Sequence, residues 1–192
     1  MAQKSLTSRP LDLLYFVFFL IHIPNTILVD CQALYPKQLV PDVIANLPKL
    51  YVGMSNDPLI GPAMGYFGAP ENYVWFKSFL LLEAFFQLPV FLLGLRGLWN
   101  GSKSIYVLLL VYAASTTTTV IPCLAVLLNT PLASADTAAK GIIAVTASQR
   151  LLLLSSYVPF LLIPLLMTVD MAFRTLSLLR AGLAAQNKIK TR

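Results

Sequence analysis

Four long apolar stretches alternate with more polar segments along the chain. They cover residues 11–29, 74–95, 105–128 and 151–173. Each reaches or approaches the ~20 residues that an α-helix needs to cross a hydrocarbon layer about 30 Å thick. The strict two-residue alternation of membrane β-barrel strands is missing from all four stretches. Because only helices and closed barrels satisfy backbone polar groups in lipid, the pattern predicts an all-α, four-helix transmembrane bundle.

The longest connection between the predicted spans covers residues 30–73 and carries four of the eight acidic residues. It is long for a structureless loop in a compact protein. Its scattered apolar residues therefore predict one or two short helices that form a cap over one end of the bundle. The whole chain is expected to be a single domain, with residues 174–192 as a basic tail.

Every predicted span contains proline; the set is Pro24, Pro89, Pro122, Pro159 and Pro164. Each proline removes a helical hydrogen bond and frees the carbonyl four residues earlier. One interpretation is ordinary kinking, since proline is more frequent in membrane helices than in soluble ones. The other is that the kinked helices splay around a polar cavity, which would supply partners for the freed carbonyls. Both interpretations stay open at the level of the sequence.

The positive charges are unevenly distributed between the two sides of the predicted membrane. The chain has 14 Lys and Arg against 8 Asp and Glu, a net charge of +6. One side holds both termini and nine of the basic residues: Lys4, Arg9, Arg96, Lys103, Arg174, Arg180, Lys188, Lys190 and Arg192. By the positive-inside rule both termini are expected in the cytosol. This placement explains the net charge without a nucleic-acid partner.

The sequence does not predict a bound metal or cofactor. It has one histidine and two cysteines, and no pair of them has the spacing of metal ligands. Zinc, haem and other cofactors are therefore not predicted. Cys31 and Cys123 are expected to be buried free thiols rather than a disulfide.

Polar residues occur inside all four predicted spans. Ionisable residues within a membrane are functional-site candidates by default. Glu83 and Gln87 are one helical turn apart on the second span. The first span has the stripe His22, Thr26 and Asp30, the third has Thr116 to Thr119, and the fourth has Ser155, Ser156 and Tyr157. Their presence on every span predicts that they meet in the middle of the bundle.

Glu83 is the most informative of these residues because phenylalanines and leucines surround it in the sequence. An unpaired carboxylate in hydrocarbon would sooner take up a proton. Holding a glutamic acid protonated at pH 7 costs roughly 3.7 kcal/mol, which a folded bundle can tolerate. A proton shared with Asp30 would leave one net negative charge, which would attract an apolar molecule that bears an amine. Depth is the difficulty, because Glu83 lies about 9 to 13 Å below the surface and Asp30 ends its span near it.

Simpler interpretations exist for the other candidates. His22 could be a hydrogen-bonded core residue, and Gln87 and the threonines could join helices for about 1 kcal/mol or less each. Asp57, which precedes a proline, could cap a turn or a helix start. Tyr157 could serve packing alone.

Five segments carry a resemblance to a known family. They are LYFVFFLIHIPNTILVDCQALYP at 14–36, NDPL at 56–59, WFKSFLLLEAFFQLPVF at 75–91, YAASTTTTVIP at 112–122 and QRLLLLSSYVPFLLIP at 149–164. In these segments the chain resembles the sigma-2 receptor family and its fungal relatives. These are four-span proteins of the EXPERA group, which also includes the emopamil-binding sterol isomerases. The stretch IGPAMGYFGAPENY at 60–73 departs from the family pattern, so the resemblance does not predict the shape of the cavity mouth.

The resemblance implies a protein of the endoplasmic-reticulum membrane with a cavity open toward the bilayer. That cavity would bind sterols and cationic amphiphiles, and relatives are commonly homodimers. The family's amine-contacting acid matches Asp30, the acid hydrogen-bonded to it matches Glu83, and the supporting acid matches Asp57. Neighbouring cavity positions match His22, Gln87, Thr119 and Tyr157. The C-terminal KIKTR looks like a di-lysine retrieval signal on a cytosolic tail, although basic tails are common on membrane proteins.

The expected function is therefore a non-enzymatic binder of sterols and amphipathic amines. One alternative is an enzyme resembling the sterol double-bond isomerases, with Glu83 and Asp30 as acid and base. The His and Glu arrangement of those isomerases has no residue-by-residue match here. Another alternative is a trafficking or chaperone-like factor, since some fungal relatives are associated with the delivery of mitochondrial precursors.

Overall fold

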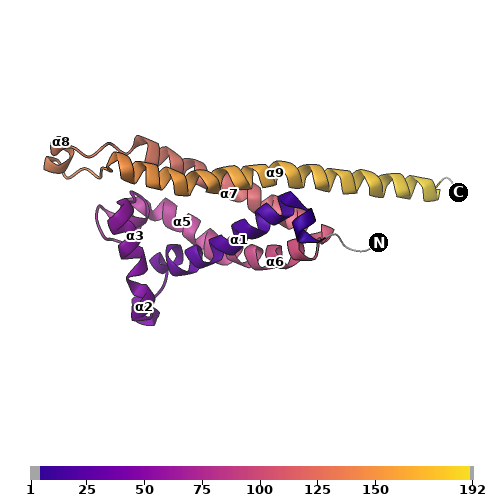
Figure 1. Cartoon of the computed structure of the whole chain (residues 1–192), viewed down its shortest axis with the longest axis horizontal. Helices are drawn as coiled ribbons and strands as arrows, with labels where there is room; N and C mark the ends of the chain where they lie inside the picture. Colours follow the sequence, from indigo (N-terminus) through magenta and orange to yellow (C-terminus); the bar gives the residue numbers. More distant parts are fainter. Residues whose placement is uncertain (1–4, 191–192) are drawn as a thin grey trace.

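Four long helical segments form the body of the protein (Figure 1). A computed structural model describes residues 5–190, so Lys4 and Arg192 of the charge analysis lie outside the described residues. The segments long and apolar enough to cross a membrane are Pro10–Ala33, Pro70–Trp99, Lys103–Asn129 and Ala147–Lys190. The prediction of an all-α, four-helix bundle is confirmed.

The first two spans pack against each other along the half of the bundle that carries the termini. Helix α1 (Pro10–Leu28) lies along α6 (Leu88–Trp99). Gly94 permits this close approach, because a Cβ atom there would come within 2.6 Å of the Phe19 ring. The core at this contact contains Tyr15, Phe19, Phe91, Leu109, Tyr112 and Met167, all fully buried.

The second span is interrupted by one π-helical turn. It runs through α5 (Val74–Leu82), the π-turn Glu83–Gln87 and then α6. Pro89 has no N–H to donate to the carbonyl of Phe85, so the regular hydrogen-bond ladder cannot continue there. The Leu88 N–H bonds to the carbonyl of Glu83, five residues back, which is the π pattern. The proline thus widens the turn that carries both polar residues of this span.

The other two spans, α7 (Tyr106–Asn129) and α9 (Ala147–Lys190), pack side by side over much of their length (Figure 1). The short α8 (Ala135–Ala139) belongs to the loop that connects α7 to α9, and it begins with a capping box formed by Ser134 and Thr137. Both α7 and α9 continue through their prolines, Pro122 in α7 and Pro159 and Pro164 in α9.

Helix α9 is longer than the membrane requires. Its 44 residues span about 66 Å at 1.5 Å per residue. In Figure 1 it runs past the ends of α1, α6 and α7 on the side where both termini lie. The segment 174–192, expected as a tail, is therefore a continuation of the fourth span at least as far as Lys190.

We call the end of the bundle with both termini the terminal end, and the opposite end the loop end. At the loop end, residues 30–73 form α2 (Asp42–Ala45), α3 (Leu47–Ser55) and α4 (Ile60–Ala63). Three-residue and four-residue 3₁₀ turns at Asp30–Ala33, Lys37–Leu39 and Pro70–Tyr73 connect them. Buried residues of this segment (Val52, Leu59, Ile60 and Ala63) join a second core with Phe76, Leu80, Leu127 and Leu153.

Candidate functional site

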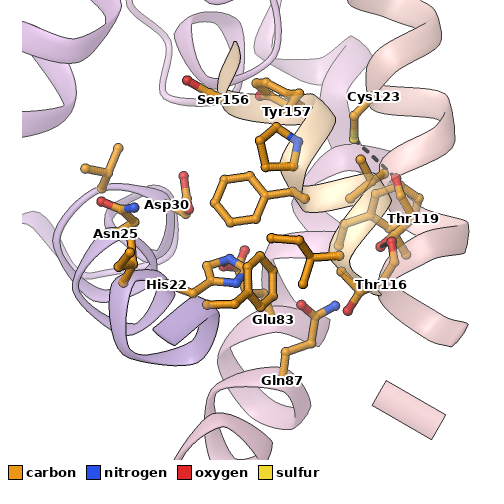
Figure 2. Close-up of a pocket in the computed structure, with 18 of the residues that line it drawn as sticks. His22, Asn25, Asp30, Glu83, Gln87, Thr116, Thr119, Cys123, Ser156 and Tyr157 are labelled. Atoms are coloured by element: carbon orange, nitrogen blue, oxygen red, sulfur yellow. Dashed lines mark hydrogen bonds and ion pairs between the residues drawn. The ribbon is translucent and has the colours of Figure 1, made fainter. Parts of the chain in front are cut away.

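A pocket of about 550 Å³ lies inside the loop-end half of the bundle (Figure 2). All four spans contribute to its wall, together with residues of the 30–73 connection. Its wall is mostly apolar. The polar and charged residues that line it are His22, Asn25, Asp30, Tyr51, Glu83, Gln87, Thr116, Thr119, Ser155, Ser156 and Tyr157. Within residues 5–190 the lining thus contains two carboxylates and one imidazole, but no lysine or arginine.

The pocket opens sideways between α1 and α9. Helix α1 packs mainly on α6 and α9 mainly on α7, and beside the pocket α1 and α9 meet through Phe160, which contacts Phe18 and His22. Val17 and Ile21 of α1 line the pocket and are also exposed on the outer surface, as is Pro159 of α9. In a bilayer this opening faces the acyl chains, so an apolar molecule can reach the pocket without crossing water.

Glu83 is held by two residues of α1. The Thr26 hydroxyl donates a hydrogen bond of 2.6 Å to Glu83 Oε1. His22 Nε2 lies 3.5 Å from the same oxygen, within the range of an ion pair if the imidazole is protonated. Thr26 is fully buried and one turn after His22, so α1 presents both groups to the π-turn that carries Glu83.

Aromatic rings enclose His22. Its ring stacks on Phe91 with a centroid distance of 4.7 Å, and Phe160 and Phe18 lie 4.5 Å and 5.3 Å away. Its Nδ1 atom is buried and has no hydrogen-bond partner within residues 5–190. His22 is therefore held among aromatic rings with its Nε2 atom directed at the Glu83 carboxylate.

Asp30 occupies a different part of the pocket wall. The helical geometry of α1 ends at Val29, and Asp30 begins a 3₁₀ turn at the loop end. In Figure 2 its carboxylate lies across the pocket from the threonines of α7. Across the described chain, no protein group donates a hydrogen bond to this carboxylate or forms an ion pair with it. Asp30 is thus an acid that faces an apolar pocket without a counter-charge.

The direct hydrogen bond expected between Asp30 and Glu83 is not found within residues 5–190. Glu83 bonds to Thr26 instead, which lies one helical turn before Asp30 on α1. The difference in depth between the two acids explains this outcome, because the residue of α1 at the level of Glu83 is Thr26. Both acids still line the same pocket.

Asp57 supports the pocket from behind its wall. It is fully buried, and its Oδ1 accepts hydrogen bonds from the backbone N–H groups of Leu59 (2.8 Å) and Ile60 (3.0 Å). Its Oδ2 accepts from the hydroxyls of Tyr51 (2.7 Å) and Tyr157 (3.0 Å), both of which line the pocket. Burial raises the pKa of the Asp57 carboxyl, while these four hydrogen bonds act in the opposite direction. Asp57 therefore stabilises the turn that leads into α4 and also fixes two tyrosines of the pocket wall.

The side of the pocket formed by Gln87 and the threonines of α7 is polar but neutral. Gln87 and Thr116 are buried there, and Thr119 lies three residues after Thr116 on α7. The Thr119 hydroxyl donates to the carbonyl of Thr116 at 3.1 Å, and the Cys123 thiol donates to the carbonyl of Thr119 at 3.3 Å. Cys31 and Cys123 are both buried free thiols. Among the described residues no group of three or more His, Cys, Asp or Glu could hold a metal ion.

A second polar cluster lies at the terminal end, outside the pocket. Asp12 accepts hydrogen bonds from Arg9 and from Arg174, the latter at 2.6 Å. Arg174 also forms a two-pronged ion pair with Asp170, with distances of 2.9 Å and 2.8 Å. Tyr15 donates to Asp170 at 3.1 Å. We call these five residues the charge cluster; it joins α1 to α9, and Arg9 extends it to backbone carbonyls of Leu98 and Trp99 at the end of α6.

The structure also shows residues and contacts that the sequence pattern does not indicate. Thr26 was recognised as part of the α1 stripe, but nothing pointed to its bond with Glu83. Tyr51 lies in the loop connection, where no periodic signal assigns a residue to the pocket. The charge cluster was overlooked because Arg9 and Arg174 were interpreted only as topological charges. The spacing of Asp170 and Arg174, four residues apart on one helix, was the available signal.

Comparisons with known proteins agree with this architecture. The sequence profile of EXPERA (EXPanded EBP superfamily) matches residues 43–171. "Sigma intracellular receptor 2" of Homo sapiens and its counterpart in Macaca fascicularis are each 37% identical to this chain over 166 residues, covering 86% of this chain and 89% of theirs. "Efficient mitochondria targeting-associated protein 19" of Saccharomyces cerevisiae is 24% identical over 158 residues, covering 79% of this chain and 91% of the yeast protein.

Proposed function

Since the chain belongs to the EXPERA family and encloses an acidic pocket between its membrane helices, we propose that it binds sterols and cationic amphiphiles there. In this proposal it is a non-enzymatic protein of the endoplasmic-reticulum membrane with a role in lipid handling. The observation that carries the proposal is the Asp30 carboxylate. It lines an apolar pocket that opens toward the bilayer and has no partner in residues 5–190.

The electrostatics of the pocket favour a cationic ligand. A charge in a low-dielectric site is expensive unless an opposite charge compensates it. His22 lies beside Glu83, but neither lysine nor arginine lies in the described lining to compensate Asp30. The ammonium group of an amphiphile would supply the missing charge, and its apolar body would replace lipid along the wall. Asp30 is the counter-ion in this account, and Glu83 is the second acid that sets the pocket's net charge.

The dimensions and polarity of the pocket also suit a sterol. A volume of about 550 Å³ lies within the ~300–1,000 Å³ typical of small-molecule pockets. The wall is mostly apolar, and its neutral polar groups, such as Gln87 and Thr119, can exchange hydrogen bonds with a single hydroxyl. The lateral opening between α1 and α9 admits a molecule that is already dissolved in the membrane.

Binding to the Asp30→Asn variant tests the proposal. Asparagine keeps the size of aspartate but removes its charge, so the affinity for a radiolabelled lipophilic tertiary amine should fall at least 100-fold in purified, folded protein. The matched control is Asp42→Asn, an exposed acid of the same loop connection that does not line the pocket. Retained amine affinity in Asp30→Asn would refute the ion-pair account.

One observation favours a second function, that of a sterol double-bond isomerase. His22 and Glu83 lie 3.5 Å apart inside the pocket, and such a pair could move a proton to and from an alkene. The binder proposal predicts that purified protein leaves the double bond of a Δ8-sterol where it is. Product with a shifted double bond, lost in Glu83→Gln, would establish the enzyme instead.

The proposed location depends on the C-terminal KIKTR. Lys188 and Lys190 lie at the end of α9, whereas Thr191 and Arg192 lie outside the described residues. Replacing both lysines by serine should release a tagged protein from the endoplasmic reticulum to later compartments, as seen by fluorescence microscopy. The Arg180→Ser variant is the control, because it removes a basic residue from the same helix without touching the motif.

A further inference from the structure

The part of α9 that projects beyond the bundle is exposed along its length. From Leu176 to Lys190 every described residue is exposed, whereas Met171 is still fully buried in the bundle. These 15 residues extend about 22 Å beyond the body of the protein. A helix of this length is only marginally stable in water without packing partners. Its surface is therefore a candidate for contact with another molecule.

One face of this projection is apolar. Leu176, Leu179 and Leu183 are spaced by three and four residues and so lie in a row along the helix. The row continues the exposed residues Leu165, Val169 and Ala172 of the membrane-spanning part in the same seven-residue pattern. Inside the membrane such a row can face lipid, but beyond the membrane it faces water. We call Leu176, Leu179 and Leu183 the leucine row.

The charge of the projection is entirely positive. It carries Arg180, Lys188 and Lys190, and no acidic residue follows Asp170 in the sequence. Arg180 follows Leu179 directly and borders the leucine row, and Lys190 continues the row one heptad after Leu183. A surface that combines leucines with flanking positive charges is complementary to a helix that combines leucines with flanking carboxylates.

We propose that the leucine row and the basic residues beside it dock an acidic amphipathic helix of another protein. The geometry disfavours the bilayer surface as the occupant, because α9 continues in line with its membrane span and does not turn to lie flat (Figure 1). A second copy of α9 is disfavoured by charge. Parallel pairing would bring Lys190 against its counterpart at a core position and would offer Arg180 no acid.

The test uses the full-length protein in lipid nanodiscs and a fluorescent synthetic helix as the probe. The probe has 21 residues, with leucine at the a and d positions of each heptad and glutamate at e and g. A matched probe carries lysine at e and g. Fluorescence anisotropy should show binding of the glutamate helix with at least 10-fold higher affinity than the lysine helix. Equal affinity, or no binding of the glutamate helix, would overturn the proposal.

Two neighbouring leucines provide the matched variants. Leu179 belongs to the row, whereas Leu178 is exposed on another face of the same turn. Leu179→Gln should weaken binding of the glutamate helix at least 10-fold, and Leu178→Gln less than 2-fold. Arg180→Gln should weaken it several-fold and reduce its dependence on salt. Equal losses in the two leucine variants would show that the row is not the docking face.

A further variant distinguishes a second copy from a different partner. Leu179→Cys places a thiol in the leucine row, while the native Cys31 and Cys123 are buried. Under mild oxidation the variant should remain monomeric on a non-reducing gel. If two copies instead form a disulfide efficiently, and neither dilution nor the glutamate helix prevents it, the leucine row serves self-association. That result would overturn the proposal.

Discussion

The charge cluster at the terminal end and the pocket at the loop end use the same kinds of residue with opposite results. In the charge cluster, two arginines meet two aspartates, and each carboxylate has at least two donors. In the pocket, Asp30 and Glu83 meet one histidine and neutral hydroxyls. The first set is complete within the protein, and the second leaves one acid without a partner in residues 5–190.

This difference separates a structural role from a binding role. A complete set of ion pairs has nothing left to offer a ligand, and it ties α1, α6 and α9 together at one end. The incomplete set lies where pocket-lining residues of α1 and α9 are exposed, and the two helices meet there through Phe160 and His22 rather than through ion pairs. The bundle is thus held by ion pairs at the terminal end, whereas at the loop end its pocket reaches the outer surface. In this bundle the acid that lacks a partner is therefore the stronger candidate for binding a ligand.

The largest effect on stability is expected from breaking the charge cluster. Arg174→Gln leaves Asp12 and Asp170 without their shared cation, and removing one partner of a buried ion pair typically costs ~3–5 kcal/mol. Thermal unfolding of detergent-solubilised protein, followed by loss of the monodisperse size-exclusion peak, measures the change. Arg180→Gln, an exposed arginine on the same helix, should shift the midpoint by less than about one degree.

A double-mutant cycle of Asp12 and Arg174 tests whether these two residues act together. Asp12→Asn alone should also destabilise the protein, and the double variant with Arg174→Gln should lose clearly less than the sum of the two single losses. Additive losses would show that the two residues act independently, which would contradict the cluster. Amine binding by the surviving Asp12→Asn protein should stay within a factor of two of wild type.

The next largest loss of stability is expected when Asp57 loses a hydrogen-bond donor. All the donors to this acid are neutral groups. Tyr51→Phe removes the 2.7 Å hydrogen bond to Oδ2 and should cost about 2 kcal/mol. Because that bond favours the charged carboxylate, its loss raises the Asp57 pKa further above its ordinary value. The deficit is therefore largest where Asp57 is charged, and it shrinks as the pH falls and Asp57 becomes protonated. Unfolding midpoints over a descending pH series measure it, with the exposed Tyr66→Phe as control.

A smaller effect is expected at Thr26. Thr26→Val keeps the shape of the side chain but removes the donor to Glu83, at a cost of about 1.5 kcal/mol. Glu83 keeps His22 as its neighbour, so the affinity for a lipophilic amine should change only a few-fold. Thr118→Val is the matched control on an exposed position of α7. A loss of binding as large as that of Asp30→Asn would move the counter-ion role toward Glu83.

The smallest change in stability, and the only favourable one, is expected at Asp30. Asp30→Asn removes a charge that the protein does not compensate, so the ligand-free variant should be more stable by about 1 kcal/mol, a rise of roughly 2–4 °C in midpoint. A saturating amine should raise the midpoint of wild type but not of the variant. Destabilisation of the ligand-free variant would mean that Asp30 has a structural role.

Much of this molecule could be predicted from its sequence, because the lipid environment allows few solutions. Uninterrupted apolar runs of this length can only be spanning helices, and the ionisable residues among them are expected to face the interior of the bundle. The polar pattern predicts His22, Asp30, Glu83 and Gln87 as site candidates, and the family resemblance adds Thr119 and Tyr157; all six line one pocket. The resemblance also implies a role for Asp57, which lies behind the wall.

The pairing of those polar residues was decided by the tertiary structure alone. Whether Glu83 meets Asp30 or Thr26 depends on the relative height of α1 and the second span, which a shift of one turn, about 5.4 Å, would change. Sequence periodicity fixes the face on which a residue lies but not its height against a neighbouring helix. The π-turn has a local cause in Pro89, but the charge cluster and the relative placement of α1 and α9 follow from contacts between segments far apart in the chain. Those contacts are set by packing, which no local pattern encodes.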